Sequence, residues 1–186
     1  MIASAISVAG LLHASGSNAA RVPRMRLVML GTAGGPRPRK SRSAPAQAVV
    51  IGDRAYVIDC GDGVARQMVL ADIPLDSIRG VFITHQHSDH TADYGNLLLL
   101  AWTAGLKTRV DCFGPPPLAR MTHLFLEMNA ADIDTRIKDE ARVPLQPLLH
   151  VREIEKAGAV FEVEPIRRHY GGPIVMGADL MDIKVG

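Results

Sequence analysis

ITHQHSDHT (residues 83–91) places three histidines and one aspartate within six positions, directly after an apolar run. The chain has only seven histidines in 186 residues, so nearly half of them lie here. A single histidine is more often a solvated or hydrogen-bonded residue than a ligand. Four specified residues at fixed spacing, however, should arise from composition alone in roughly one chain per thousand of this size. The segment therefore predicts a functional site rather than a structural accident.

The spacing within this segment is typical of a metal site. His85 and His87 are two positions apart, so in an extended backbone their imidazoles project to the same side. Asp89 and His90 follow at the point where the chain must turn into the next helix. Imidazole nitrogens and carboxylate oxygens are ordinary zinc ligands, and two ions about 3.5 to 4 Å apart can share one segment. We expect each pair of side chains to serve one ion of a binuclear site.

The regions around this segment predict alternating strands and helices. Short β-rich or apolar runs closed by glycine or polar residues indicate strands, and QAVVIG, GDR and AYVID together indicate a hairpin. The strands are expected at residues 26–31, 47–52, 55–59, 80–84 and 108–114, and the helices at 64–71, 96–105 and 118–128. The histidine segment then follows the carboxyl end of a strand, where α/β proteins gather functional residues on loops.

Further expectations concern the ends and faces of the helices. Asp62 is placed to cap the helix at 64–71. The apolar residues of the helix at 118–128 fall on one stripe, which we expect to be core: Leu118, Met121, Leu124, Phe125 and Met128. Residues 132–147 are charged and contain proline, so they are compatible with either a helix or a loop. The last forty residues are typical of short strands with turns.

Composition bounds the class of protein. A chain that is 47% hydrophobic and 22% charged is an ordinary globular domain, and its net charge of +2 does not by itself indicate a nucleic-acid partner. Cys60 and Cys112 form no paired CxxC spacing, and we expect both to be buried as small apolar residues. No stretch is long and apolar enough to predict a membrane-spanning helix.

Residues 1–22 differ in composition from the rest. They are apolar and rich in small residues and end near an alanine pair, which is compatible with a signal peptide, although the usual basic start is absent. The alternative is a disordered extension, so a periplasmic or secreted location and a cytoplasmic one both stay open. The domain itself is expected at residues 25–186.

Thr84 to His90 resembles the HxHxDH signature of the metallo-β-lactamase superfamily. Three further stretches resemble the branch of that superfamily that contains ribonuclease Z and arylsulfatase-like hydrolases. They are MLGTAGGPRP, DCGDGVARQ and DCFGPPPLARM, which resemble an opening strand with a glycine-rich loop, a strand-to-helix turn, and a later strand with a Gly-Pro turn. The resemblance runs from about Arg26 to Phe125.

The resemblance implies the N-terminal portion of an αββα sandwich with two Zn²⁺ ions at one edge of the sheets. His85 and His87 would bind the first ion, and Asp89 and His90 the second. Asp59 would support the site by hydrogen bonding to the metal-binding loop, although a role as a cap or turn residue is equally compatible with its position. Asp89 would also act in catalysis, orienting the attacking water or accepting its proton.

The chain departs from the family pattern after residue 125. The family site needs a third histidine, a bridging aspartate and a last histidine. Asp179 and His169 are weak candidates, because His169 lies only ten positions before Asp179 and no histidine follows. The remaining histidines, His13, His123 and His150, lie in no ligand pattern. The sequence thus predicts the N-terminal part of a larger enzyme, with weak metal binding and an exposed sheet edge that favours a homodimer.

Three functions stay open at this stage. The first is zinc-dependent hydrolysis of phosphate or sulfate esters, with either RNA or a small-molecule ester as substrate and transfer-RNA 3′ endonuclease cleavage as the branch's best-known activity. The second is hydrolysis of a lactam, thioester or lactone on the same scaffold, and the third is an inactive, metal-binding fragment. PRPRKSR (residues 36–42) offers cations that could receive phosphates, or it is a solvated loop. An aromatic content of 4% weighs against stacking of unpaired bases.

Overall fold

The computed structural model describes residues 25–155 and 181–185. The expectations for residues 1–22, His169 and Asp179 lie outside these ranges. No helix of the described residues has the length and apolar character needed to cross a membrane.

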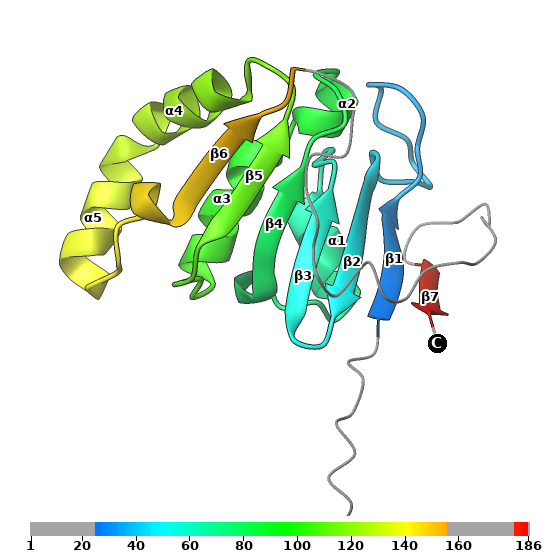
Figure 1. Cartoon of the computed structure of the whole chain (residues 1–186), viewed down its shortest axis with the longest axis horizontal. Coiled ribbons are helices and arrows are strands. Elements are labelled where there is room, and N and C mark those ends of the chain that lie inside the picture. The colour runs from blue at the N-terminus through cyan, green and yellow to red at the C-terminus, as the bar shows by residue number, and fades with distance from the viewer. Residues whose placement is uncertain (1–24, 156–180, 186) are drawn as a thin grey trace, which may run out of the picture.

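The described strands form one seven-stranded sheet in the order β6-β5-β4-β3-β2-β1-β7 (Figure 1). Their bounds are β1 Met25–Gly31, β2 Ala46–Ile51, β3 Arg54–Ile58, β4 Ile78–Phe82, β5 Val110–Gly114, β6 Leu149–Glu153 and β7 Met181–Val185. The predicted hairpin is confirmed, since β2 and β3 pair antiparallel around Gly52, whose φ of 61° suits a tight turn. The five strands expected before residue 115 are all present.

Strand direction brings distant loops to one edge of the sheet. β3, β4, β5 and β6 are mutually parallel, and β1 runs in the same direction because both β1 and β3 are antiparallel to β2. The carboxyl ends of β1, β3, β4 and β5 therefore meet at one edge. The basic loop, the DCGDG turn and the histidine segment follow three of these strands.

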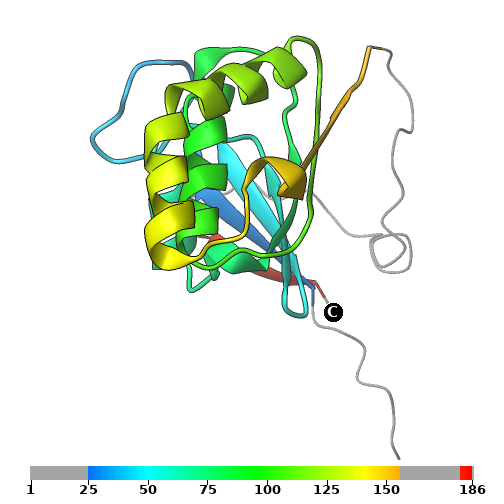
Figure 2. The same cartoon turned by 90° about the vertical axis from the view of Figure 1, so that its left-hand side faces the viewer.

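The helices cover one face of the sheet (Figure 2). They are α1 Val64–Leu70, α3 Tyr94–Thr103, α4 Leu118–Met128 and α5 Ala130–Glu140, with the single turn α2 Ser88–Thr91 at the carboxyl edge. The main core lies between α1, α3 and the sheet, with Leu30, Val57, Val81 and Leu97 among its fully buried residues. α3 is apolar on nearly every side, as expected for a largely buried helix.

Apolar side chains also line the opposite face of the sheet. Met25, Ile51 and Tyr56 form a second cluster there, against which Val49 and Phe82 pack. A sheet that is apolar on both faces needs a layer on each side. The described residues supply one helix layer and one sheet, which is the arrangement expected of the N-terminal portion of an αββα sandwich.

The apolar stripe of α4 is only partly core, which corrects the sequence expectation. Leu118 is fully buried, but Leu124 is 47% and Met128 74% exposed. α4 packs on the edge strand β6 and on α3. Phe125 packs on the smaller cluster around Trp102, and Thr122 is buried. The buried face of α4 is therefore rotated away from Leu124 and Met128.

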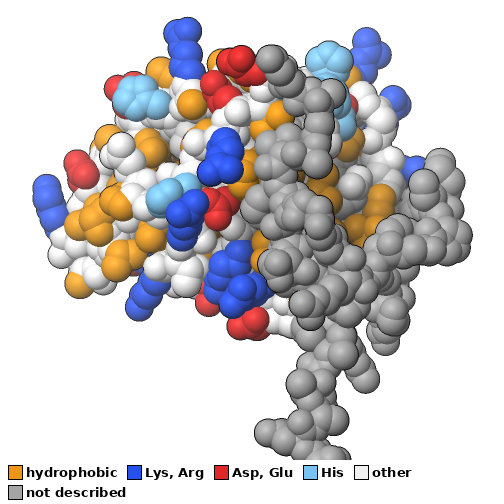
Figure 3. All heavy atoms as spheres, viewed as in Figure 1, with side chains coloured by type: hydrophobic (Ala, Val, Ile, Leu, Met, Phe, Trp, Pro, Cys, Tyr) orange, Lys and Arg blue, Asp and Glu red, His pale blue; other side chains and the backbone are white. Residues whose placement is uncertain are grey.

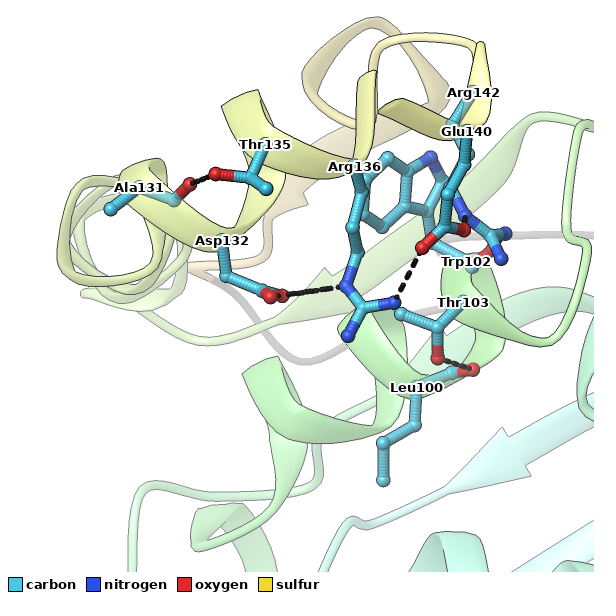
Figure 4. A network of polar contacts seen from close by, with 9 residues as sticks. All are labelled: Leu100, Trp102, Thr103, Ala131, Asp132, Thr135, Arg136, Glu140 and Arg142. Atoms are coloured by element: carbon cyan, nitrogen blue, oxygen red, sulfur yellow. Dashed lines mark hydrogen bonds and ion pairs between the residues drawn. The ribbon is translucent and has the colours of Figure 1, made fainter. Parts of the chain in front are cut away.

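Residues 132–147 contain a helix and a loop. α5 is followed by a turn and by η2 Gln146–Leu148, which leads into β6. On α5, Arg136 bridges Asp132 and Glu140, one helical turn to either side (Figure 4). Arg142 then ties the loop to α3 by donating to the carbonyl of Trp102, whose indole N–H in turn donates to the Val143 carbonyl at 2.8 Å.

The expectation that Asp62 caps α1 is wrong. The N-cap residue is Gly63, with φ 81°. As a glycine it has no side chain that could form a capping hydrogen bond. Asp62 is instead exposed beside a cavity. The backbone N–H of Gly63 is bonded by another residue, Asp93.

Candidate metal centre

The histidine segment forms the loop after β4 and the short helix α2. In the space-filling view, histidine and basic side chains lie close together at the carboxyl edge of the sheet (Figure 3). Ile83 is buried and fixes the start of the loop, while its N–H donates to the carbonyl of Phe113 in β5. The loop thus begins from a rigid strand and carries its polar side chains outward.

His85 and His87 lie together, as their spacing predicts. Their Nε2 and Nδ1 atoms are 3.2 Å apart, and the ring centroids are separated by 4.7 Å. Both nitrogens can therefore approach one ion with little movement, at the ligand distances of about 2.0 to 2.1 Å that zinc requires.

Asp89 and His90 form the second pair. The Asp89 Oδ2 atom lies 3.5 Å from His90 Nε2, and both side chains are largely buried. The His85 and His90 rings are also close, with centroids 4.0 Å apart. The two pairs are thus adjacent, which is the arrangement that two neighbouring ions require.

The Asp59 carboxylate binds three hydrogen-bond donors of the histidine segment. Its carboxylate accepts hydrogen bonds from the Thr84 backbone N–H at 2.8 Å, from the Thr84 hydroxyl at 2.9 Å, and from His90 Nδ1 at 2.7 Å. The residue adopts φ 60°, a left-handed conformation that aspartate tolerates better than most residues. The expected hydrogen bonding of Asp59 to the metal-binding loop is therefore observed.

These contacts also select the free nitrogen of two histidines. His90 donates through Nδ1 to Asp59, which leaves its Nε2 lone pair pointing toward Asp89. The Thr84 hydroxyl gives its proton to Asp59, so it accepts from His85 Nδ1 at 3.0 Å, and the His85 Nε2 lone pair then faces His87 Nδ1. Metal-binding histidines are oriented in this way. The donor set accordingly fits divalent ions.

The fit has a limit in the number of donors. No group of three histidine, cysteine, aspartate or glutamate side chains is placed to hold a common ion within residues 25–155. Two donors are available for each ion, where structural and catalytic zinc sites use three or four protein ligands. The weak candidates Asp179 and His169 belong to the part of the chain without description.

The DCGDG turn lies directly against the metal segment. The Cys60 N–H donates to the His90 carbonyl at 2.7 Å, and the Asp93 N–H donates to the Cys60 carbonyl at 2.9 Å. A Cβ atom at Gly61 would stand 2.5 Å from the carbonyl oxygen of Asp89, which is too close for a carbon atom. Glycine is required there because the two backbones touch.

A cavity of about 440 Å³ opens beside Asp89. The basic loop forms one wall of this cavity, with Arg37, Arg39 and Arg42, and α1 forms another with Arg66. Arg39 and Arg42 pair across a tight turn, so this loop has a defined shape. The arginines of segment 36–42 thus line the same cavity as Asp89.

The two cysteines are free and fully buried, as expected. Burial raises the pKa of the Cys60 thiol well above its usual value, and the nearby Cys112, Asp59 and Asp93 raise it further. Burial also raises the pKa of Cys112 to about 12. Both thiols are protonated at neutral pH and do not join the donor set.

Two residues that sequence patterns did not indicate also fix the metal segment. The Gln86 carboxamide donates to the Pro115 carbonyl at 2.6 Å, and Asp93 accepts from the Gly63 N–H at 2.7 Å. Gln86 lies between two histidines, and Asp93 stands where a helix cap is expected. Neither position carries a signal that predicts its distant partner.

Fold and site together define an α/β protein that presents a divalent-metal segment at the carboxyl edge of a mixed sheet. A family profile described as the metallo-beta-lactamase superfamily matches residues 44–180. The chain therefore belongs to the metallo-β-lactamase superfamily.

Curated relatives belong to the branch suggested by the sequence. A ribonuclease Z from Mycobacterium sp. strain KMS is 33% identical over 137 residues, which are 73% of this chain and 48% of that protein. A ribonuclease Z from Mycolicibacterium gilvum is 27% identical over 165 residues, or 87% of this chain and 52% of the relative. The chain thus spans about half the length of these relatives.

Solved structures confirm the fold. The short form of human tRNase Z is similar with a TM-score of 0.56 and 22% identity, over 71% of this chain and 46% of that one. A long form RNase Z from yeast gives a TM-score of 0.54 at 12% identity, over 73% of this chain and 19% of that one.

Proposed function

We propose that this chain carries the metal-binding part of a zinc-dependent hydrolase of the ribonuclease Z-like branch, acting on phosphate esters. The observation that carries the proposal is the pairing of four donor atoms at one edge of the sheet. His85 faces His87 and Asp89 faces His90, within 3.2 and 3.5 Å. Nitrogen and carboxylate donors of this kind suit zinc among the divalent ions.

Each residue has a defined role in this proposal. His85 and His87 would hold one ion, and Asp89 and His90 the other, while Asp59 and Thr84 keep the imidazoles oriented. When bound, the ions would supply an activated water and stabilise negative charge on the transferred group. Asp89 borders the cavity, and we assign its carboxylate to orient the attacking water or to take up its proton.

The cavity supports a phosphate or sulfate ester over acyl substrates. Arg37, Arg39 and Arg42 stand beside Asp89, and guanidinium groups bind the oxygens of phosphate through paired hydrogen bonds. The matched relatives are named ribonuclease Z, so RNA is one substrate to test beside small phosphodiesters. An aryl sulfate carries the same single negative charge as a phosphodiester, so the names of the matched relatives, and not the arginines, favour phosphate over sulfate.

Turnover with four substrates tests the proposal. The purified 186-residue chain with Zn²⁺ is assayed on bis(p-nitrophenyl) phosphate, an aryl sulfate, a cephalosporin and a precursor transfer RNA. We expect cleavage of a phosphodiester and its loss in the His87→Ala variant. His123→Ala is the matched control, because His123 is 66% exposed on α4 and contacts only Glu127 among the described interactions. Turnover that survives His87→Ala, or that is confined to the cephalosporin, would rule the proposal out.

The two-donor limit favours a second candidate function, which is weak metal binding without turnover by this chain. Elemental analysis after dialysis separates the two candidates. Retention of two ions per chain with turnover supports the hydrolase. Metal that is lost on dialysis, together with no turnover at saturating Zn²⁺, supports the second candidate.

A further inference from the structure

Asp93 occupies the N-cap position of α3 but does not cap this helix. Aspartate at such a position normally accepts a hydrogen bond from the second or third N–H of its own helix. Here its side chain makes no capping bond within α3. The Oδ2 atom instead accepts from the Gly63 N–H at 2.7 Å, thirty positions earlier in the chain.

The partner of Asp93 is the helix end that lacks a cap. Gly63 has no side chain to cap α1, and the first turn of α1 contains no acidic residue. A carboxylate at this end satisfies a free N–H and complements the positive end of the helix dipole. The carboxylate of Asp93 thus caps the N-terminus of α1 and leaves the N-terminus of α3 without a side-chain cap.

This hydrogen bond is one of a set that joins the DCGDG turn to residues 90–93 of the metal segment. Asp59 and Gly63 lie at the two ends of the DCGDG turn, while His90 and Asp93 lie three positions apart on the facing segment. Asp59 binds the His90 ring, Cys60 binds the His90 and Asp93 backbones, and Asp93 binds Gly63. The contacts of Cys60 are made by backbone atoms, whereas Asp93 binds Gly63 through its side chain. A substitution at Asp93 can therefore remove this one hydrogen bond.

We propose that Asp93 is a positioning residue that locks the DCGDG turn onto the segment carrying Asp89 and His90, and thereby sets the affinity for the second metal ion. The assignment rests on the proposed function. His85 and His87 precede α2 in the chain, and their part of the loop is held by Thr84 and Gln86 instead. Loss of the lock should therefore affect the two ions unequally.

The test compares Asp93→Ser with Asp93→Asn in the full 186-residue chain. Serine is a good N-cap residue for α3 but is too short to reach Gly63, whereas asparagine keeps an acceptor oxygen at the same distance. Asp132→Ser on α5 is the control for loss of a remote carboxylate. Stepwise Co²⁺ titration followed by visible absorption measures each ion, and amide hydrogen exchange measures protection of Gly63.

We expect Asp93→Ser to weaken the second ion about tenfold, with the first ion changed less than twofold, because removal of groups that orient metal ligands has effects of about this size. Gly63 should lose protection from exchange in the same variant. Asp93→Asn should restore both, and Asp132→Ser should change neither.

Three results would overturn the assignment. The first is that Asp93→Ser binds both ions as tightly as the wild type. The second is that Asp93→Ser weakens both ions equally and Asp93→Asn does not restore them, which would indicate a general structural role. In either case the proposed function stands. A wild-type chain that binds no Co²⁺ and no Zn²⁺ would instead overturn the proposed function and this assignment together.

Discussion

A single carboxylate sets the geometry of the candidate metal centre. Asp59 is only 6% exposed in its side chain, and it accepts from both Thr84 groups and from His90. Its position at the end of β3 makes these contacts rigid, since the neighbouring strand β4 leads directly into the histidine loop. The orientation of two imidazoles therefore depends on a residue outside the four candidate donors.

Asp59→Asn should weaken metal binding while leaving the fold intact. Asparagine also tolerates the left-handed backbone of this residue, but one of its two acceptor oxygens becomes an NH₂ group. It cannot then accept from Thr84 and from His90 together. We expect a 10- to 100-fold loss of Zn²⁺ affinity by competition with a chromophoric chelator. Asp53→Asn, at the exposed β2–β3 turn, should show no loss.

Gln86→Met should loosen the first pair of donors. Methionine has nearly the same length as glutamine but cannot donate to the Pro115 carbonyl, so the backbone between His85 and His87 loses its anchor. We expect weaker binding of the first ion with little change in the second, measured by Co²⁺ titration. An unchanged first step would show that the loop is held well enough by Thr84 alone.

The four candidate donors and the supporting role of Asp59 were predictable from the sequence, but the contacts of Gln86 and Asp93 were not. His85, His87, Asp89 and His90 are close in sequence, so local backbone geometry alone brings each pair together. The contact of Asp93 with Gly63 depends on how α1 and α3 meet, and no local pattern encodes this. Asp62 shows the reverse error, because its sequence position predicts a cap that the positive φ of Gly63 rules out.

At the scale of elements, the apolar stripe of α4 does not coincide with the buried face of that helix. Leu118 is fully buried and Phe125 packs on the smaller cluster around Trp102, whereas Met128 is 74% exposed. Helical periodicity predicts which residues share a face, but it does not show which part of that face meets a neighbouring element. The bounds of α4 were therefore predictable, whereas the extent of its buried stripe was not.

Alanine substitutions at the two ends of α4 should differ in their effect. Leu118→Ala removes buried methyl groups beneath β5 and should lower the free energy of unfolding by about 2 to 5 kcal/mol. Met128→Ala should change it by less than about 0.5 kcal/mol, because the side chain is mostly in water. Urea denaturation measures both. Equal losses would mean that Met128 is covered in solution.

At the scale of the whole molecule, the two buried thiols report on the core. Cys60 and Cys112 are both fully buried in the main core between the helices and the sheet. A reagent such as Ellman's reagent reaches them only when the helix layer opens. Their modification rate in the native state should therefore track the opening of the core rather than local mobility.

The raised pKa of Cys112 predicts a loss of stability at high pH. Its ordinary pKa is 9.0, and in the folded chain it is raised to about 12 by burial. Between these values the unfolded chain releases a proton that the folded chain keeps, so the free energy of unfolding decreases as pH rises above about 9. This contribution is fully present below pH 9. Cys112→Val should flatten the decline in urea denaturations at pH 8 and 10.5, and an unchanged slope would contradict the assignment.

The sheet order has a consequence for how the chain reaches its fold. β1 lies between β2 and β7, and Met25 pairs with Val185. The hairpin partner of β1 emerges early in synthesis, whereas its other partner emerges some 150 residues later, and contacts between such distant segments form slowly because the loop must close first. During translation β1 is thus an open template for strand addition until residues 181–185 arrive. Assembly of this protein is most vulnerable in that interval, at the margin of the sheet away from α4 and α5.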